Sequence, residues 1–169
     1  MEVQILSRAR YNVGVRSGFT LIELLLVLGI FLIVGVAITP LYGNFLVSTQ
    51  LNEEASQLVQ NLRLARAQSV AGLNHVVHGV CFESNSTPPD RYIIYAGASC
   101  AARDQTLDRI ISLTPALKLT TTFPMNGNVS DLNFSATGAP SITGTITLTH
   151  TTSGARTITV NELGLVEEN

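Results

Sequence analysis

The chain has 169 residues, 46% of them hydrophobic, which corresponds to one domain of ordinary size plus its ends. The net charge is −2, and because the first 18 residues carry +2, the remainder carries −4. This balance argues against a general nucleic-acid binder. The two cysteines, Cys81 and Cys100, are too few for a disulfide scaffold but sufficient for one bridge in an oxidising compartment.

The apolar residues are concentrated near the N-terminus. Of the twenty residues 19–38, only Thr20 and Glu23 are strongly polar. A helix of that length rises about 30 Å, the thickness of a bilayer core, so we predict a transmembrane helix over residues 19–40. Arginines precede this segment, and a long stretch without Lys or Arg follows it. The N-terminus is therefore expected in the cytoplasm and the C-terminal domain on the other side of the membrane.

A secretory signal peptide, cleaved to release a secreted β domain, is the alternative interpretation of the same segment. Gly35 and Ala37 have the small-residue spacing that an ordinary leader peptidase recognises. Two features argue against it. The apolar run is longer than the roughly 7 to 15 residues usual in such leaders. The carboxylate of Glu23 is also unfavourable in an apolar environment, and a disposable leader has no use for it.

Residues 41–72 are predicted to form an amphipathic helix that continues the apolar segment into the C-terminal domain. Its small or apolar residues recur at spacings of three and four, which places them on one face. They are Leu51, Ala55, Leu58, Leu62, Ala65 and Ser69. Pro40 is expected to kink the helix, because proline lacks a backbone donor and crowds the preceding turn. Gly72 is the predicted helix stop.

Residues 73–169 are predicted to form an antiparallel β domain, because the pattern changes to extended runs rich in β-branched and aromatic residues. The predicted strands lie within residues 75–84, 91–97, 109–113, 117–123, 129–136, 144–150 and 155–161. The first two and the last two read as hairpins, and breaks are expected at Pro115 and over residues 124–128. Glu167 and Glu168 are predicted to form a solvated tail. The fold class is α+β, with the amphipathic helix covering the sheet.

The stretch GFTLIELLLVLGI, residues 18–30, resembles the class III leader junction of type IV pilins and type II secretion pseudopilins. The resemblance implies that residues 1–18 are a leader peptide. A prepilin peptidase would cut after Gly18 on the cytoplasmic face and then methylate the new N-terminal residue, Phe19. The apolar segment would be kept, first as an anchor in membrane lipid and then as the core of a filament.

Members of that family carry a carboxylate at the position of Glu23, and its chemistry suggests a reason. Cleavage after Gly18 creates an α-amino cation at Phe19, one helical turn from Glu23 and within reach of it or of the corresponding residue in a neighbouring subunit. An unpaired carboxylate is costly in a low dielectric, so such a pair would neutralise the charge and set the axial register of subunit docking. Simple hydration near the lipid headgroups is the alternative role of Glu23.

The C-terminal half resembles the GspH/FimT-like pseudopilins and minor pilins. The shared pattern is a Phe, a following Gly, a strand, a hairpin and a late Gly-x-Val. It lies here in LNFSATGAP, TGTITLTH and GARTITVNELGLV. Major pilins commonly end with a disulfide-closed loop near the C-terminus, and that loop is missing here. The difference favours a minor subunit.

Together, the two resemblances imply a structural subunit, not an enzyme, at or near the tip of a type IV pilus or a type II secretion pseudopilus. The expected partners are prepilin peptidase, other pilins or pseudopilins bound through the N-terminal helix, and the inner-membrane assembly platform. The expected location is the bacterial inner membrane, with a periplasmic domain, and then the filament. The sequence does not decide between the two machines. A DNA-binding competence pilin is an alternative, but the last strands contain Arg156 beside three acids, so we expect no nucleic-acid partner.

No pattern predicts a catalytic site, a metal site or a cofactor. His75 and His78 face opposite sides of an extended segment, and no third ligand completes a zinc shell. No Ser, His and acid set with mechanistic spacing is present. Cys81 and Cys100 flank the first hairpin, but Cys100 follows its second strand by several residues. Strand register therefore does not force them to pair, and a disulfide and free thiols both stay open.

Overall fold

The computed structural model describes the backbone of residues 18–85, 89–152 and 154–168, and their side chains apart from those of residues 37–42 and 44. Most of the predicted leader, residues 1–17, lies outside this range. The side chain of Pro40 also lies outside this range, so the helix kink predicted at Pro40 stays a prediction. The chain divides into two compact units, Met1–Leu41 and Tyr42–Asn169.

The helix α1 covers Leu21–Val70. At its start, the side-chain oxygen of Thr20 accepts a hydrogen bond from the backbone N–H of Glu23 at 3.3 Å. This bond satisfies one of the donors that a helix leaves unpaired in its first turn. The helix ends where Gly72 adopts a left-handed φ of 64°, as the sequence predicts. A short 3-10 turn, η1 (Leu73–His75), follows.

In the first unit, α1 presents apolar side chains to its surroundings. Every large apolar side chain from Leu21 to Val36 is exposed, from 40% at Val27 to 76% at Leu21. Within the part of the chain that the structure describes, no helix combines the length and the apolar character needed for crossing a membrane.

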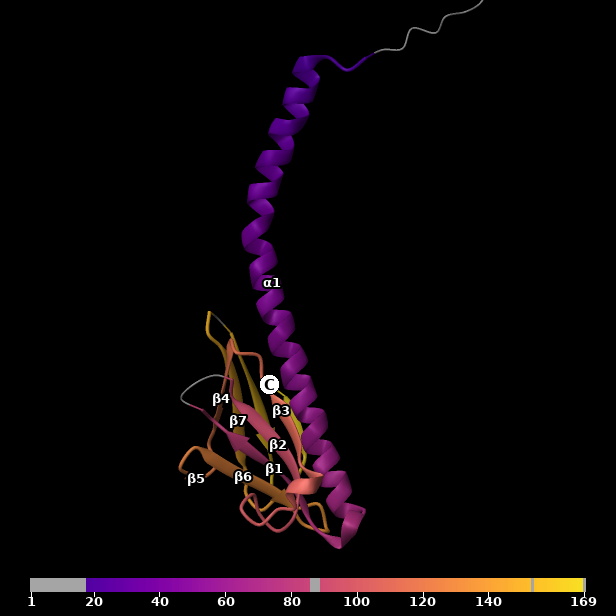
Figure 1. Ribbon diagram of the computed structural model, residues 1–169, viewed down its shortest axis with the longest axis vertical. Helices are drawn as coiled ribbons and strands as arrows, with labels where there is room; N and C mark the ends of the chain where they lie inside the picture. The colour runs from indigo at the N-terminus through magenta and orange to yellow at the C-terminus, as the bar shows by residue number, and fades with distance from the viewer. Residues whose placement is uncertain (1–17, 86–88, 153, 169) are drawn as a thin grey trace, which may run out of the picture. The chain divides into compact units, whose positions relative to one another are not determined.

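The second unit contains two antiparallel sheets beside α1 (Figure 1). The first has the strand order β3-β2-β1-β6-β5. Its strands are β1 His78–Glu83, β2 Arg91–Ala96, β3 Arg109–Ser112, β5 Met125–Asn126 and β6 Val129–Phe134. The second has the order β4-β7-β8-β9, formed by β4 Leu117–Thr121, β7 Gly144–His150, β8 Ala155–Val160 and β9 Val166–Glu168. A second 3-10 turn, η2 (Gln105–Leu107), precedes β3.

The α+β fold class is confirmed, and each predicted strand segment contains a strand. Both predicted hairpins are present, with β1 pairing β2 and β7 pairing β8. Two details of the prediction are wrong. Residues 125–126 lie within the predicted break but form β5 against β6. The predicted tail residues Glu167 and Glu168 belong to β9, which pairs with β8, although their side chains are exposed.

One hydrophobic core joins α1 to both sheets. The predicted helix face is buried, with Ala55, Leu58, Leu62 and Ala65 at 0% exposure. The same cluster includes inward-facing residues of both sheets; among them are Val80, Phe82, Leu132, Phe134, Leu119, Ile146, Leu148 and Ile158. The period of three and four therefore predicted the helix face correctly, because this face is the surface that the sheets cover.

Candidate functional site

The first candidate site is the start of α1. Gly18 and Phe19 precede the helix and are exposed, Phe19 by 83%. Glu23 lies in the first turn, where a negative charge is favoured by the helix dipole. Thr20 and Glu23 have the Thr-x-x-Glu spacing of a capping box, in which the hydroxyl binds the third N–H of the helix. That spacing is visible in the sequence, and the hydrogen bond observed uses the backbone N–H of residue 23 rather than the Glu23 carboxylate.

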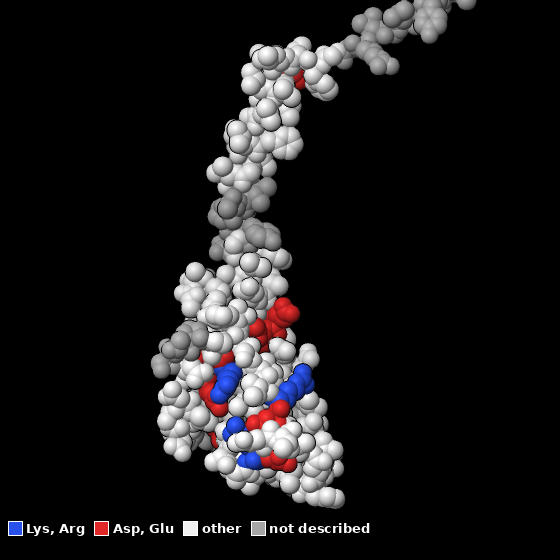
Figure 2. Space-filling view, in the orientation of Figure 1, with Lys and Arg blue, Asp and Glu red and all other residues white. Residues whose placement is uncertain are grey.

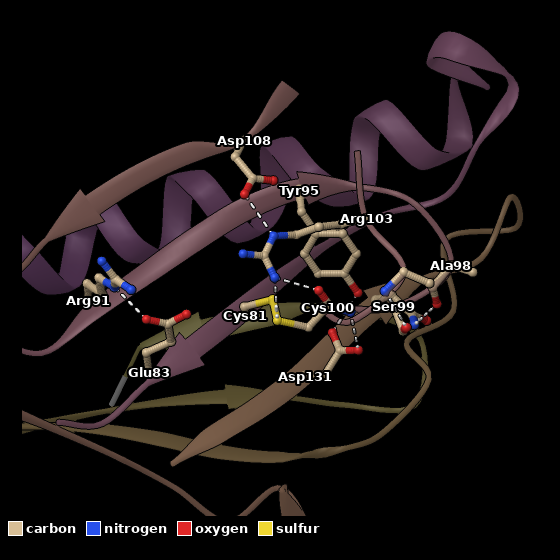
Figure 3. The surroundings of a disulfide bond; sticks show 12 residues. Cys81, Glu83, Arg91, Tyr95, Ala98, Ser99, Cys100, Arg103, Asp108 and Asp131 are labelled. Atoms are coloured by element: carbon tan, nitrogen blue, oxygen red, sulfur yellow. Dashed lines mark hydrogen bonds and ion pairs between the residues drawn. A yellow bond between two sulfur atoms is a disulfide. The ribbon is translucent and has the colours of Figure 1, made fainter. Parts of the chain in front are cut away.

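The second candidate site is a disulfide on the outer face of the first sheet (Figure 3). Cys81 of β1 is bonded to Cys100 in the loop after β2, with a Cα–Cα distance of 5.7 Å. Their neighbours on this face are Ile93 and Tyr95, which form with them a small cluster separate from the main core. The disulfide therefore fixes the loop 97–104 over the face of the sheet that points away from the helix.

Hydrogen bonds from a distant strand hold the same loop. The register of β1 and β6 places Asp131 directly opposite Cys81. The carboxylate of Asp131 accepts from the Tyr95 hydroxyl at 2.5 Å and from the Cys100 backbone N–H at 2.9 Å. Burial of the Tyr95 side chain, reinforced by its bond to Asp131, raises the pKa of the phenol above its ordinary value. One oxygen of Asp131 thus holds the loop, and the other binds Tyr95 of β2.

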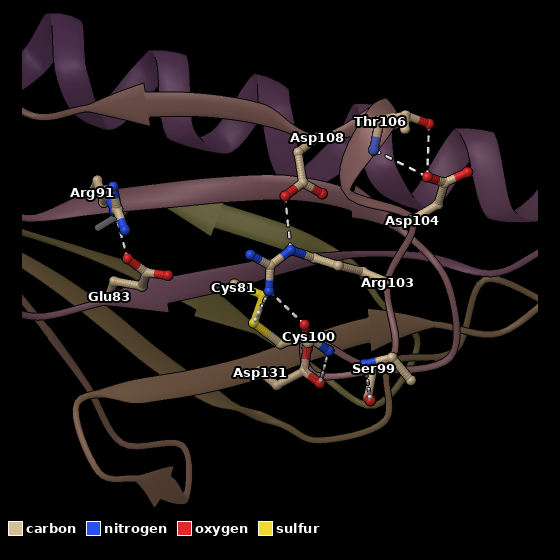
Figure 4. A network of polar contacts seen from close by, with 11 residues as sticks. Cys81, Glu83, Arg91, Ser99, Cys100, Arg103, Asp104, Thr106, Asp108 and Asp131 are labelled. Atoms are coloured by element: carbon tan, nitrogen blue, oxygen red, sulfur yellow. Dashed lines mark hydrogen bonds and ion pairs between the residues drawn. A yellow bond between two sulfur atoms is a disulfide. The ribbon is translucent and has the colours of Figure 1, made fainter.

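Arg103 completes this network (Figure 4). Its guanidinium donates to the Cys100 carbonyl oxygen at 2.5 Å and to the Asp108 carboxylate at 2.7 Å. At the start of the loop, a side chain at Gly97 would meet the backbone oxygen of Ala102 at 2.6 Å, so the two loop ends are close. These groups bind one another, so the network has a structural role and stabilises the loop 97–104.

The predicted histidine pair does not form a metal site in the described structure. His75 is exposed and His78 is buried. Among the described residues, no group of three His, Cys, Asp or Glu side chains could hold a metal ion. Figure 2 shows Lys and Arg close to Asp and Glu on the drawn face of the second unit, so that face carries both signs of charge.

Three segments distant in sequence meet at Arg66 of α1. Its guanidinium donates to the backbone oxygen of Gly138 at 3.0 Å and to that of Leu163 at 3.1 Å. Gly138 and Gly164 both have positive φ, 83° and 71°. A side chain at Gly164 would meet the Gly138 oxygen at 2.1 Å. Only glycine fits this contact, which joins the helix to the loops that follow β6 and β8.

Two known protein families match this chain, one over its N-terminal segment and one over its C-terminal domain. A model of the type II transport protein GspH matches residues 54–164, and a model of the prokaryotic N-terminal methylation motif matches residues 15–39. The chain belongs to the GspH family. GspH-family proteins are structural subunits of the pilin and pseudopilin type, which assemble with other such subunits in type II secretion or type IV pili. No curated protein and no solved structure matches the chain.

The structure brings together residues of the C-terminal pattern described above for this GspH-family chain. The Phe of the pattern is Phe134, which is fully buried in the main core. The following Gly is Gly138, and the late Gly is Gly164. These two glycines are the ones that contact each other beside Arg66. The pattern therefore records a packing requirement between helix and loops, and the residues matched by the GspH model include all of these positions.

Proposed function

We propose that this chain is a minor pilin or pseudopilin that is cleaved between Gly18 and Phe19, methylated at Phe19, and incorporated at or near the tip of its filament. The match to the methylation motif over residues 15–39 carries this proposal, because that range includes both residues of the junction. The exposure of the apolar side chains from Leu21 to Val36 supports it, since such a surface needs lipid or neighbouring helices around it.

Before assembly, the segment 19–40 anchors the subunit in the inner membrane, with the N-terminus in the cytoplasm and the β domain in the periplasm. The partners are prepilin peptidase, the inner-membrane assembly platform and other pilin-type subunits. A disulfide between Cys81 and Cys100 is consistent with an oxidising periplasm. Its position before β3, rather than near the C-terminus, supports a minor over a major subunit.

Processing is tested by N-terminal sequencing of protein extracted from membranes of the native host. We expect the sequence to begin at Phe19, with an added methyl group in the mass spectrum of the first peptide. Deletion of the peptidase should leave the uncleaved chain, which starts at Met1. A mature chain that begins after Ala37 would instead show that an ordinary leader peptidase removes the apolar segment.

Glu23 is proposed to pair with the Phe19 amine of an adjacent subunit during docking. The position of Glu23 in the first turn suggests a competing local role, in which its carboxylate only supports the helix start through the helix dipole. The two roles are separable because Thr20→Ala removes the cap and keeps the carboxylate. Glu23→Ala removes the charge and keeps the Thr20 hydroxyl, whose partner is the backbone N–H of residue 23.

We expect Glu23→Ala to insert and to be cleaved, and to be lost from the filament or its initiating complex, because a buried amine of the neighbour then lacks its counter-charge. Thr20→Ala should assemble close to wild type, since removal of a cap weakens a helix by only about 1 kcal/mol. Membrane fractionation measures insertion, and cross-linking to sheared filaments measures incorporation. Equal incorporation of Glu23→Ala and wild type would rule out the docking role.

A further inference from the structure

A pocket of about 260 Å³ opens between the last turns of α1 and the β2 and β3 strands. Buried residues form its floor, among them His78 at 4% and Tyr95 at 1% exposure. Its rim is made of exposed leucines, Leu73 at 46% and Leu107 at 48%. Its lining shares Tyr95 with the cluster around the disulfide and does not include Arg66.

The floor of the pocket contains a polar atom without a partner. The Nδ1 atom of His78 is buried and has no hydrogen bond within the part of the chain that the structure describes. Burial lowers the pKa of His78 below its ordinary value, which favours the neutral ring. Buried polar atoms in folded proteins nearly always have a partner. Because this Nδ1 atom has almost no accessible surface, an inserted group would reach it only after a shift of the ring.

The pocket also contains an uncompensated positive charge. Arg109 is the one charged side chain among the residues that line it, and no acid lines it. Among the described residues, no carboxylate lies within ion-pair distance of Arg109, whereas Arg91, Arg103, Lys118 and Arg156 each have an acidic partner within 4.0 Å. The side-chain amide of Gln68, from α1, adds a neutral hydrogen-bonding group to the lining. The chemistry of the lining therefore suits an anion attached to an apolar stem.

The size of the pocket narrows the choice of ligand. Sites for small molecules are typically about 300 to 1,000 Å³, so this pocket has room for an anchoring side chain rather than for a cofactor. Arginine is one of the residue types enriched at the positions that dominate protein interfaces.

We propose that the pocket receives an acidic side chain of a neighbouring pilin-type subunit, whose carboxylate pairs with Arg109 while its aliphatic stem packs between Leu73 and Leu107. A shift of the His78 ring then lets its Nδ1 atom form a hydrogen bond with the inserted segment. This contact rests on the proposed function, since it needs a neighbouring subunit of the filament. It adds a docking site in the β domain to the one proposed at the helix start.

The test uses the full chain in its native host, with a photo-reactive benzoylphenylalanine in place of Leu107. The matched control places the same group at Leu163, which is 69% exposed and does not line the pocket. A third probe replaces Val27 in the apolar segment and reports filament assembly independently of the pocket. Adducts are identified by mass spectrometry, and a partner counts as pilin-type when it carries its own N-terminal methylation motif.

We expect the Leu107 probe to capture a pilin-type subunit through a peptide that contains Asp or Glu, with little adduct from Leu163. Arg109→Glu should reduce this adduct about tenfold, because reversing the charge opposes the partner's carboxylate. Arg109→Lys should keep most of it. Changing the captured acid of the partner to Arg should restore the adduct in Arg109→Glu. Since Arg109 is exposed and makes no ion pair among the described residues, these variants should fold normally.

Two results would overturn the inference. One is an adduct from the Leu107 probe that is unchanged by Arg109→Glu. The other is the absence of pilin-type adducts from this probe while the Val27 probe captures pilin-type subunits, which would leave the proposed function intact. If neither probe captures a pilin-type subunit, the proposed function fails, and the pocket contact fails with it.

Discussion

Replacement of Gly164 by alanine tests the contact that underlies the C-terminal pattern of the family. Gly164 has a φ of 71°, and a Cβ atom there would lie 2.1 Å from the backbone oxygen of Gly138. A left-handed conformation costs alanine about 1 to 2 kcal/mol. The collision adds to this, because the loop after β6 must move away and its oxygen loses the hydrogen bond from Arg66 at 3.0 Å.

The size of the second effect follows from the type of bond. A hydrogen bond to a charged donor contributes about 1.5 to 3 kcal/mol, and we take the lower part of that range because Arg66 is partly exposed. Gly164→Ala should therefore reduce the free energy of unfolding by about 3 to 4 kcal/mol. Gly127→Ala is the matched control, since Gly127 has a φ of 64° and nothing within 4 Å of its added Cβ. It should lose only about 1 to 2 kcal/mol.

Urea unfolding of the full chain in detergent, followed by tyrosine fluorescence, measures both variants. Tyr92 and Tyr95 are buried in the second unit and report its unfolding. A double-mutant cycle with Arg66→Ala should show that the effects of Gly164→Ala and Arg66→Ala are not additive, because both break the same bond. Equal losses for Gly164→Ala and Gly127→Ala would refute the argument, since the close approach would then contribute nothing.

Three further predictions concern the second unit. Asp90→Ala should destabilise it by about 2 to 4 kcal/mol, measured from urea midpoints. The buried carboxylate of Asp90 accepts hydrogen bonds from the backbone N–H groups of Asn85 at 2.9 Å and Leu119 at 2.8 Å, and so joins the β1–β2 loop to β4. Replacing both disulfide cysteines by alanine should cost about 3 kcal/mol, since the bond closes a loop of sequence separation 19. The pKa of Tyr92 is raised to about 12 by burial. Stability should therefore be intact below pH 10 and fall as the pH rises from about 10 to 12, where only the unfolded chain loses this proton.

Each of these predictions has its own control. For Asp90, the control is the exposed Asp104, whose carboxylate binds Thr106 two residues further on and no other described residue, so Asp104→Ala should change stability little. A reducing agent should destabilise the wild type as much as the double cysteine replacement does, and should leave the replacement itself unaffected. Tyr92→Phe should reduce the fall in stability above pH 10 without abolishing it, because the pKa of Tyr95 is also raised. An unchanged slope would contradict the assigned role of Tyr92.

The helix and most strands could be predicted from the sequence because their signals are local. A face of α1 at spacings of three and four becomes the buried face whatever covers it, so Leu58 and Leu62 were identified without knowledge of the sheets. Alternation likewise predicted β7 and β8, whose hairpin is formed by adjacent segments. The junction at Gly18 and Phe19 is a linear pattern, and the match to the methylation motif covers it.

The pairing of Cys81 with Cys100 could not be predicted, because it depends on a distant strand. The loop after β2 turns back over the sheet where Asp131 of β6 binds the Cys100 N–H, and the register of β6 against β1 puts Asp131 there. The strand β9 was missed for a related reason. Its last residues are charged, which predicts a solvated tail, but their backbone groups pair with β8. A strand at the edge of a sheet can keep its side chains in water.

By itself, then, the sequence determined which segment is apolar, which helix face is buried, where the strands lie and which family the chain resembles. The tertiary structure decided which distant groups meet: the glycines beside Arg66, the carboxylate that holds the disulfide loop, and the pocket with His78 and Arg109. The physical reason is the distance along the chain over which each interaction acts. Periodicity and turn chemistry act over a few neighbouring residues, whereas a contact between separate segments exists only after both sheets and the helix have packed on a common core.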